Sequence, residues 1–185
     1  MSPAFIPSSL RCLALAGALT VAALMTGPVA MSDARGGGCG KTAVASKRSD
    51  RVALPGAREA VTCLINGERS ARNLKLNRHL NKAAQRHSKR MYQHSCFSHQ
   101  CPGEPNTMER ARNAGYVSGA SSYRVGEVIA LNRDKASPRE VVRQWKRSPG
   151  HRAEILSSAY EHIGVGMIAR RGKAFYTVTL GAKSG

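Results

Sequence analysis

Three side chains in this sequence have the chemistry of a metal site or of an acid–base site, and they lie in three separate segments. His99 lies in a short loop-like stretch, Glu127 in an alternating apolar stretch, and His151 just after a Pro-Gly pair. Loop, strand and helix signals meet at these positions, and side chains at such junctions can point into one cleft. We therefore expect His99, Glu127 and His151 to converge when the chain folds.

Glu127 is expected to be at least partly buried, because Val125 and Ile129 share its face of a predicted strand. A buried carboxylate must be paired or have a raised pKa, so His99 and His151 are its expected partners. Two His and one Glu can hold a catalytic zinc ion and leave one position for water. Without metal they could act as general acid and base. The alternative is a polar cluster that only organises the cleft.

Two other polar residues, His87 and Arg152, are expected to have structural rather than catalytic roles. His87 lies on the apolar face of a predicted helix, which is typical of a core or cleft-wall histidine. Arg152 is expected either to pair with Glu127 or Glu154 or to be an exposed cation.

Helical periodicity precedes most of the strand signals along the chain. The apolar spacing predicts helices over 58–73 and 77–94, a short helix over 106–114, a helix starting at Pro138, and another over 149–156. Strands are predicted over 125–130, 163–169 and 174–180, the last two forming a hairpin. This order predicts an α+β fold with helices flanking a central sheet.

The N-terminal region predicts export. An apolar run of 14 residues over 12–25 is shorter than a membrane span and precedes small residues, as in a secretory signal peptide ending at residue 30 or 34. We assign 1–34 to the signal peptide, 35–54 to a flexible basic linker, and 55–185 to one folded domain.

The net charge of +18 indicates an anionic partner. An exported protein of this charge is expected to bind an anionic cell-envelope polymer or an anionic lipid surface. The basic residues are spread along the chain without a DNA-binding motif or interleaved aromatics, so no specific nucleic acid is expected. The alternative is a basic surface with no specific partner.

Four cysteines remain after the predicted cleavage: Cys39, Cys63, Cys96 and Cys101. In an oxidising compartment they allow three pairings, of which Cys39–Cys63 with Cys96–Cys101 is favoured. Closing the short Cys96–Cys101 loop would restrict the position of His99. The alternative is a zinc site formed by Cys96, His99 and Cys101.

Several segments together resemble the CAP superfamily (cysteine-rich secretory protein, antigen 5 and pathogenesis-related 1), in its short bacterial form. In chain order they are Leu64-Ile65-Asn66-Gly67-Glu68-Arg69, Phe97-Ser98-His99, Gly126-Glu127-Val128-Ile129-Ala130, Trp145 with Ser148-Pro149-Gly150-His151-Arg152, and Ile163-Gly164-Val165-Gly166. The resemblance implies a three-layer α/β/α sandwich with a central cleft lined by His99, Glu127 and His151. Some members of the superfamily bind a divalent metal there.

The sequence departs from the fuller family pattern in two places. The second glutamate that animal and plant members carry shortly after the tryptophan has no counterpart after Trp145, and Val128 replaces the amide beside the glutamate. Both changes weaken the inference of a metal site.

The sequence thus indicates a secreted, monomeric CAP-domain protein that acts as a binding module for a lipid-like, peptide-like or cell-wall-derived ligand. The alternative is a metal-dependent extracellular hydrolase, a protease or wall hydrolase, in which His99, Glu127 and His151 hold a divalent metal such as zinc. An envelope protein with an inert cleft is a third hypothesis.

Overall fold

The structure is a computed structural model that describes residues 43–133 and 136–185. The expected signal peptide over 1–34 and residues 35–42 of the expected linker lie outside the described residues, so those assignments stay predictions. None of the helices in the described ranges is long and apolar enough to span a bilayer.

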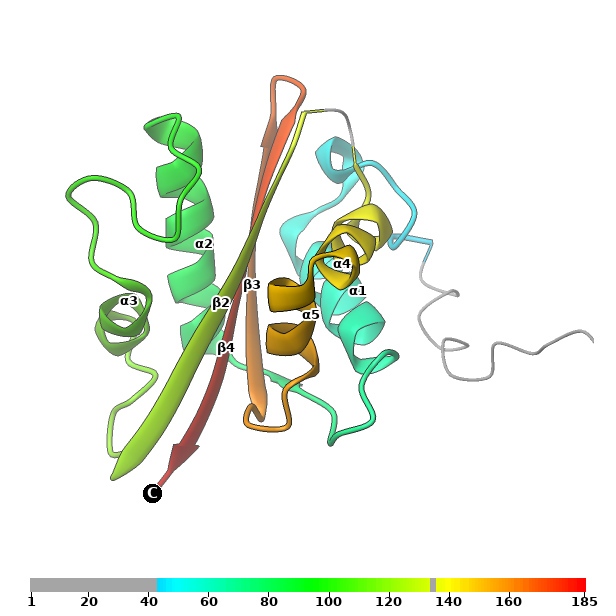
Figure 1. Cartoon of the computed structure of the whole chain (residues 1–185). Coiled ribbons are helices and arrows are strands. Elements are labelled where there is room, and N and C mark those ends of the chain that lie inside the picture. Colours follow the sequence, from blue (N-terminus) through cyan, green and yellow to red (C-terminus); the bar gives the residue numbers. More distant parts are fainter. Residues whose placement is uncertain (1–42, 134–135) are drawn as a thin grey trace, which may run out of the picture. The chain divides into compact units, whose positions relative to one another are not determined.

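A four-stranded sheet forms the middle layer of the domain (Figure 1). Its strands are β1 (Lys75–Leu76), β2 (Ser122–Asn132), β3 (His162–Arg170) and β4 (Lys173–Ser184), in the spatial order β1-β3-β4-β2. The β3–β4 hairpin and the β2–β4 pair are antiparallel, whereas β1 runs parallel to β3. The predicted hairpin is therefore confirmed, and the two-residue strand β1 was not predicted.

Helices cover both faces of this sheet (Figure 1). One face carries α2 (Arg78–Gln93) and α3 (Thr107–Asn113). The other carries α1 (Leu54–Asn66), α4 (Pro138–Arg147) and α5 (Pro149–Leu156). This arrangement confirms the expected α/β/α sandwich.

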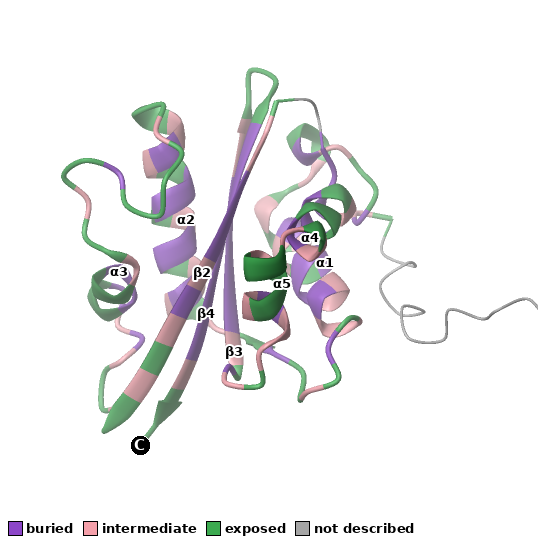
Figure 2. Cartoon of the chain, in the orientation of Figure 1, coloured by how far each residue is buried: buried purple, intermediate pink, exposed green. Residues whose placement is uncertain are grey.

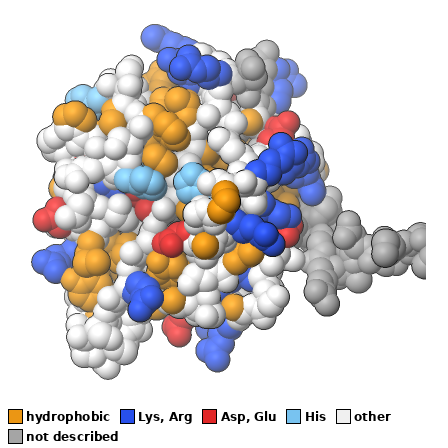
Figure 3. Space-filling model, in the orientation of Figure 1, with side chains coloured by type: hydrophobic (Ala, Val, Ile, Leu, Met, Phe, Trp, Pro, Cys, Tyr) orange, Lys and Arg blue, Asp and Glu red, His pale blue; other side chains and the backbone are white. Residues whose placement is uncertain are grey.

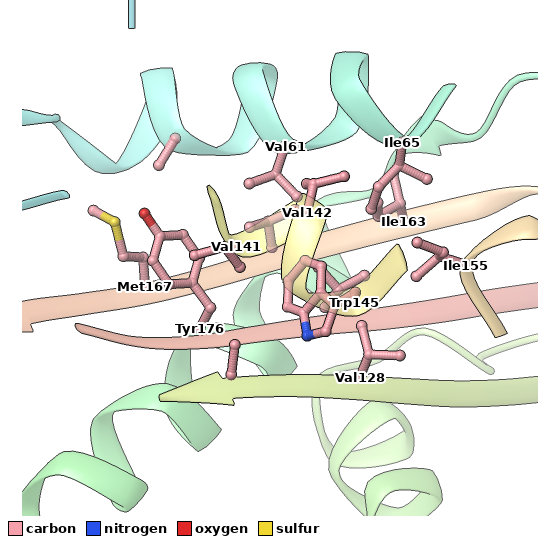
Figure 4. Close-up of a cluster of buried hydrophobic side chains, with 14 of the residues drawn as sticks. Val61, Ile65, Val128, Val141, Val142, Trp145, Ile155, Ile163, Met167 and Tyr176 are labelled. Carbon is pink, nitrogen blue, oxygen red and sulfur yellow. The ribbon is translucent and has the colours of Figure 1, made fainter. Parts of the chain in front are cut away.

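The larger hydrophobic core lies between the sheet and the α1, α4 and α5 layer (Figure 4). Trp145 is fully buried there, and its indole Nε1 donates to the Ile129 carbonyl oxygen at 2.9 Å. The middle of β4 is buried on both faces (Figure 2). The sheet is thus a rigid support for side chains that project from its edge strand β2.

Local capping determines where several helices begin. Asn77 accepts hydrogen bonds from the first backbone amides of α2, as expected from the sequence. Capping boxes begin α3, with Asn106 and Glu109, and α4, with Ser137 and Glu140. The prediction for the first helix was displaced: α1 spans Leu54–Asn66 instead of 58–73, because Pro55 favours the first turn and Gly67 takes the C-cap.

The domain begins earlier than the expected boundary at residue 55. Residues 49–51 form a short 3-10 helix, and Ala45 and Ser49 are buried. The Ser49 hydroxyl bonds to the Ala136 carbonyl oxygen and lies 2.5 Å from the Tyr176 hydroxyl oxygen. The part of the expected flexible linker that the structure describes, residues 43–54, therefore packs against the domain, because its polar groups satisfy buried partners.

Gly164 and Gly166 allow α2 to pack directly on the backbone of β3. A Cβ atom at Gly164 would overlap the backbone of Leu80 and Asn81, and one at Gly166 would overlap the backbone of Ala84 and Gln85. Two glycines on one face of β3 thus determine how close α2 lies to the sheet.

We expect Gly166→Ala to lower the free energy of unfolding by about 3 kcal/mol, because the added methyl group must displace helix backbone. The matched control is Gly150→Ala, since Gly150 lies in α5 with no atom within 4 Å of an added Cβ. This control should be stabilising by about 0.5–1 kcal/mol through helix propensity. Urea unfolding of both variants measures the difference, and equal effects would contradict the close packing of α2 on β3.

Candidate functional site

Glu127 is the centre of a polar cluster on the α3 side of strand β2. Its side chain is only 3% exposed and accepts three hydrogen bonds. The donors are His99 Nδ1 at 3.0 Å, Thr107 Oγ1 at 3.2 Å and an Arg110 guanidinium nitrogen at 2.7 Å. The prediction of a buried, paired Glu127 thus agrees with the structure, but two of its three partners had not been identified from the sequence.

Glu127 is held in its charged form by these partners. Burial is the strongest single influence and acts to raise the pKa of Glu127. The hydrogen bond from His99 and the charges of Arg110 and His87 together outweigh burial, so the pKa lies below its usual value. The carboxylate is therefore a fixed anion at neutral pH.

His87 lies fully buried between two carboxylates. Its Nδ1 atom is 2.9 Å from Glu104 Oε2, and its Nε2 atom is 3.8 Å from Glu127 Oε1. The expected core or cleft-wall role agrees with this burial, but the pairing with Glu104 was not predicted. Glu104 precedes α3 in an irregular segment, where no periodic pattern shows which way a side chain points.

Arg110 connects the cluster to the loop that carries His99. One guanidinium nitrogen donates to the backbone carbonyls of His99, at 3.0 Å, and Pro105, at 2.8 Å. The other donates to Thr107 Oγ1 and to Glu127. The positions 107 and 110 are one helical turn apart, and that spacing was the available sequence signal for their shared face.

The Cys96–Cys101 disulfide forms as predicted and closes the loop around His99. Disulfide sulfurs are not thiolate ligands, so the alternative zinc site of Cys96, His99 and Cys101 is wrong. The other expected pairing involves Cys39, which lies outside the described residues. With its carbonyl held by Arg110 and its Nδ1 on Glu127, the His99 ring keeps 53% of its side-chain surface exposed.

His151 approaches from the other helix layer, in the first turn of α5. Burial, and secondly the charge of His99, lower the pKa of His151. Figure 3 shows histidine side chains close together on this face. The hydrogen bonds that Glu127 accepts in the described structure come from His99, Thr107 and Arg110, so the expected pairing of His151 with Glu127 is not among them.

Of the two alternatives expected for Arg152, the structure shows the exposed cation. It is exposed, and Arg110 is the cation that pairs with Glu127. Glu154 instead accepts a hydrogen bond from the Tyr160 hydroxyl at 2.6 Å.

The donor set of the cluster determines whether it could hold a metal ion. No group of three or more His, Cys, Asp or Glu side chains within residues 43–133 and 136–185 is arranged to hold a metal ion. Glu127 already accepts hydrogen bonds at both carboxylate oxygens. Zinc binding by His99, His151 and Glu127 stays a prediction, with no preformed geometry in its favour.

We expect Arg110→Met to lower the free energy of unfolding by about 3–5 kcal/mol at pH 7, because it leaves the Glu127 charge buried without its cation. The lowered pKa of Glu127 stabilises the fold above the unfolded pKa of the carboxyl group, and this contribution is lost as pH falls through the folded pKa. The deficit of the variant should therefore shrink in acid. Urea unfolding between pH 7 and pH 3 measures it.

Arg112→Met is the matched control on the same helix. Arg112 is exposed and donates to the Tyr123 hydroxyl at 2.7 Å, so its loss should leave the free energy of unfolding nearly unchanged at every pH. A deficit of Arg110→Met that is small, or that does not depend on pH, would show that Arg110 does not compensate the Glu127 charge.

Comparisons with known proteins agree with this fold. The model of the cysteine-rich secretory protein family, CAP, matches residues 57–180. The uncharacterized protein YkwD of Bacillus subtilis (strain 168) is 33% identical over 135 residues, which cover 68% of this chain and 49% of YkwD. The chain thus spans about half the length of this curated relative.

Solved structures show the same similarity. An extracellular protein containing a SCP domain from Bacillus anthracis str. Ames superposes with a TM-score of 0.59 at 26% identity, covering 68% of this chain and 40% of that one. An outer surface protein from Borrelia burgdorferi has a TM-score of 0.55 at 16% identity, covering 68% of this chain and 89% of that one. At this low identity the similarity shows a shared fold and nothing more. Because the family model matches more than half of the residues, the chain belongs to the cysteine-rich secretory protein (CAP) family.

Proposed function

We propose that this protein is an extracellular binding module, in which the exposed imidazole of His99 and the neighbouring His151 contact the polar group of an amphiphilic ligand. An extracellular protein with a SCP domain is among its structural relatives, which supports an extracellular location. The proposed ligand is lipid-like, peptide-like or derived from the cell wall.

One observation carries this proposal: His99 is exposed but held in one orientation. Its Nδ1 atom is bound to Glu127, whose own position is fixed by Arg110 and Thr107. The Nε2 atom is therefore the ring nitrogen left for a ligand. A preoriented side chain loses little conformational entropy on binding, so such an arrangement favours recognition.

Two exposed apolar side chains, on the loop of His99 and on α3, support an amphiphilic ligand. Phe97 and Met108 are 50% and 41% exposed, and they lie on the loop and the helix that also carry His99 and Thr107. Exposed large hydrophobic residues beside convergent polar groups are typical of ligand sites. A ligand with an apolar part over Phe97 and a hydrogen-bonding group at His99 would match both features.

A metal-dependent hydrolase remains the alternative, and it makes a different demand on the same residues. It needs a further metal ligand besides His99 and His151, because Glu127 is engaged with Arg110, Thr107 and His99. A binding module needs only the two imidazoles and the apolar surface around them.

The proposal is tested by NMR titration of the oxidised protein with dodecanoate and with muramyl dipeptide. At least one probe should shift the signals of residues 97–110 and 148–155. His99→Ala and Phe97→Ser should each weaken binding by about tenfold, as expected for the loss of one good contact. The control is His94→Ala, because His94 is an exposed histidine at the end of α2.

Two results would overturn the binding module. One is that neither probe shifts these signals, or that His99→Ala binds as well as the parent. The other is stoichiometric zinc binding that is lost in both His99→Ala and His151→Ala, which would favour the hydrolase.

A further inference from the structure

A cationic hollow lies at the outer edge of strand β3, away from the histidines. It encloses about 370 Å³ and is lined by Arg58, Arg78, Asn81, Lys82, Gln85 and Arg86. Arg58 comes from α1 and the other five residues come from α2. Because these helices cover opposite faces of the sheet, the hollow spans the sheet edge between the two layers.

The outer face of α2 carries the cations at regular intervals. Leu80, Ala84 and His87 face the sheet and are fully buried. Arg78, Lys82 and Arg86 are exposed and follow one another every four residues. At a rise of 1.5 Å per residue this places successive cations ~6 Å apart along one side of the helix. The three side chains thus form a row ~12 Å long, which suits an extended anion better than a compact one.

The side chains of Asn81, Gln85 and Arg58 form hydrogen bonds with the exposed backbone edge of β3. Strand β1 pairs with β3 only at His162 and Ile163. Further along β3, Asn81 Oδ1 accepts from the Val165 amide at 2.8 Å, and the Gln85 side chain makes two hydrogen bonds with the Met167 backbone. These contacts satisfy an edge that could otherwise pair with another chain. They also fix the floor of the hollow.

Arg58 is held at this floor. Its Nε donates to the Val165 carbonyl oxygen at 3.0 Å, and its guanidinium is half-buried. Burial lowers the pKa of Arg58, which means that the site disfavours an uncompensated cation. An anion in the hollow would offset that cost.

The described residues that line the hollow do not include an acid. Its lining contains four cationic residues and no Asp or Glu. Among the described residues, the ion pairs do not include any of these four cations. The Arg78 side chain donates a hydrogen bond from its Nε to the Nε2 of His79 at 3.1 Å. The charge of the hollow is therefore available to an external ligand.

We propose that this hollow binds an extended polymer with one phosphodiester per repeat, of the poly(glycerol phosphate) type. One phosphate group would pair with Arg58 and Arg78 in the hollow, and the following repeats would run past Lys82 and Arg86. A flat anionic surface would reach the exposed row but not the recessed Arg58, so the concave shape favours a chain. The counterions released from such a polymer would favour binding at low salt.

The hollow and the histidine cluster lie at opposite edges of the sheet. The hollow follows β3 where it extends beyond β1, and Glu127 lies on β2 at the other end of the order β1-β3-β4-β2. A polymer bound at the hollow would therefore leave His99 and His151 accessible. This inference does not depend on the function proposed for the histidines.

The test is isothermal titration calorimetry with poly(glycerol phosphate) of about ten repeats at several salt concentrations, on the folded chain with its disulfide intact. Lys82→Ala/Arg86→Ala should weaken binding by about tenfold, since two surface ion pairs of ~0.7 kcal/mol each correspond to that factor. Both side chains are exposed, so the fold should be kept, which circular dichroism checks.

The matched control is Arg143→Ala/Arg147→Ala, which removes the same charge from two exposed positions four residues apart on α4. It should bind within about twofold of the parent. Equal losses in the two double variants would show that net charge alone drives binding and would overturn the site.

Three further results would overturn the proposal in other ways. The proposal would be wrong if the parent protein did not bind poly(glycerol phosphate) at low salt. Equal affinity for glycerol 3-phosphate would show a single-anion site rather than a polymer site. Binding of phosphatidylglycerol vesicles with the same loss in Lys82→Ala/Arg86→Ala, but not of the polymer, would assign the surface to membranes.

Discussion

The candidate site depends on one buried charge, the carboxylate of Glu127. A charge removed from water in this way is costly unless it is paired and hydrogen-bonded, and Arg110 supplies the main compensation. The same guanidinium binds the backbone carbonyls of His99 and Pro105. One cation therefore balances the carboxylate and also determines the path of the loop that presents His99.

The second carboxylate of this cluster comes from an unexpected place. The family pattern places a second glutamate shortly after the tryptophan, and the segment directly after Trp145 has no counterpart. The structure instead places Glu104 against His87, which in turn lies 3.8 Å from Glu127. Two carboxylates with His87 and Arg110 between them thus form a buried network behind the exposed His99. Such a network supports the surface imidazole but does not itself offer open metal ligands.

Close packing of α2 on the sheet links the two surfaces of the molecule. Gly164 and Gly166 let the helix approach β3, and this brings His87 into the interior on one side. The same approach brings Asn81 and Gln85 within hydrogen-bonding distance of the β3 edge. Arg78, Lys82 and Arg86 on the outer face of α2 then line the same hollow as Arg58. The two glycines of β3 therefore influence the positions of residues in both the histidine cluster and the cationic hollow.

The sequence by itself determined the helices and strands with strong local signals. Asn77, Pro138 and the hairpin around Gly172 were located correctly, because capping and turn chemistry depend on neighbouring residues. It also indicated the family, the Cys96–Cys101 disulfide and the burial of Glu127.

Only the tertiary structure decided which side chains other than His99 meet Glu127. Arg110 and Thr107 come from α3, and Glu104 lies in an irregular segment, so neither periodicity nor spacing relates them to a residue on β2. The packing of residues 43–54 and the pairing of β1 were likewise invisible to local patterns, because both rest on contacts with residues far along the chain. Long-range contacts satisfy buried polar groups, and which groups are buried is known only once the layers have packed.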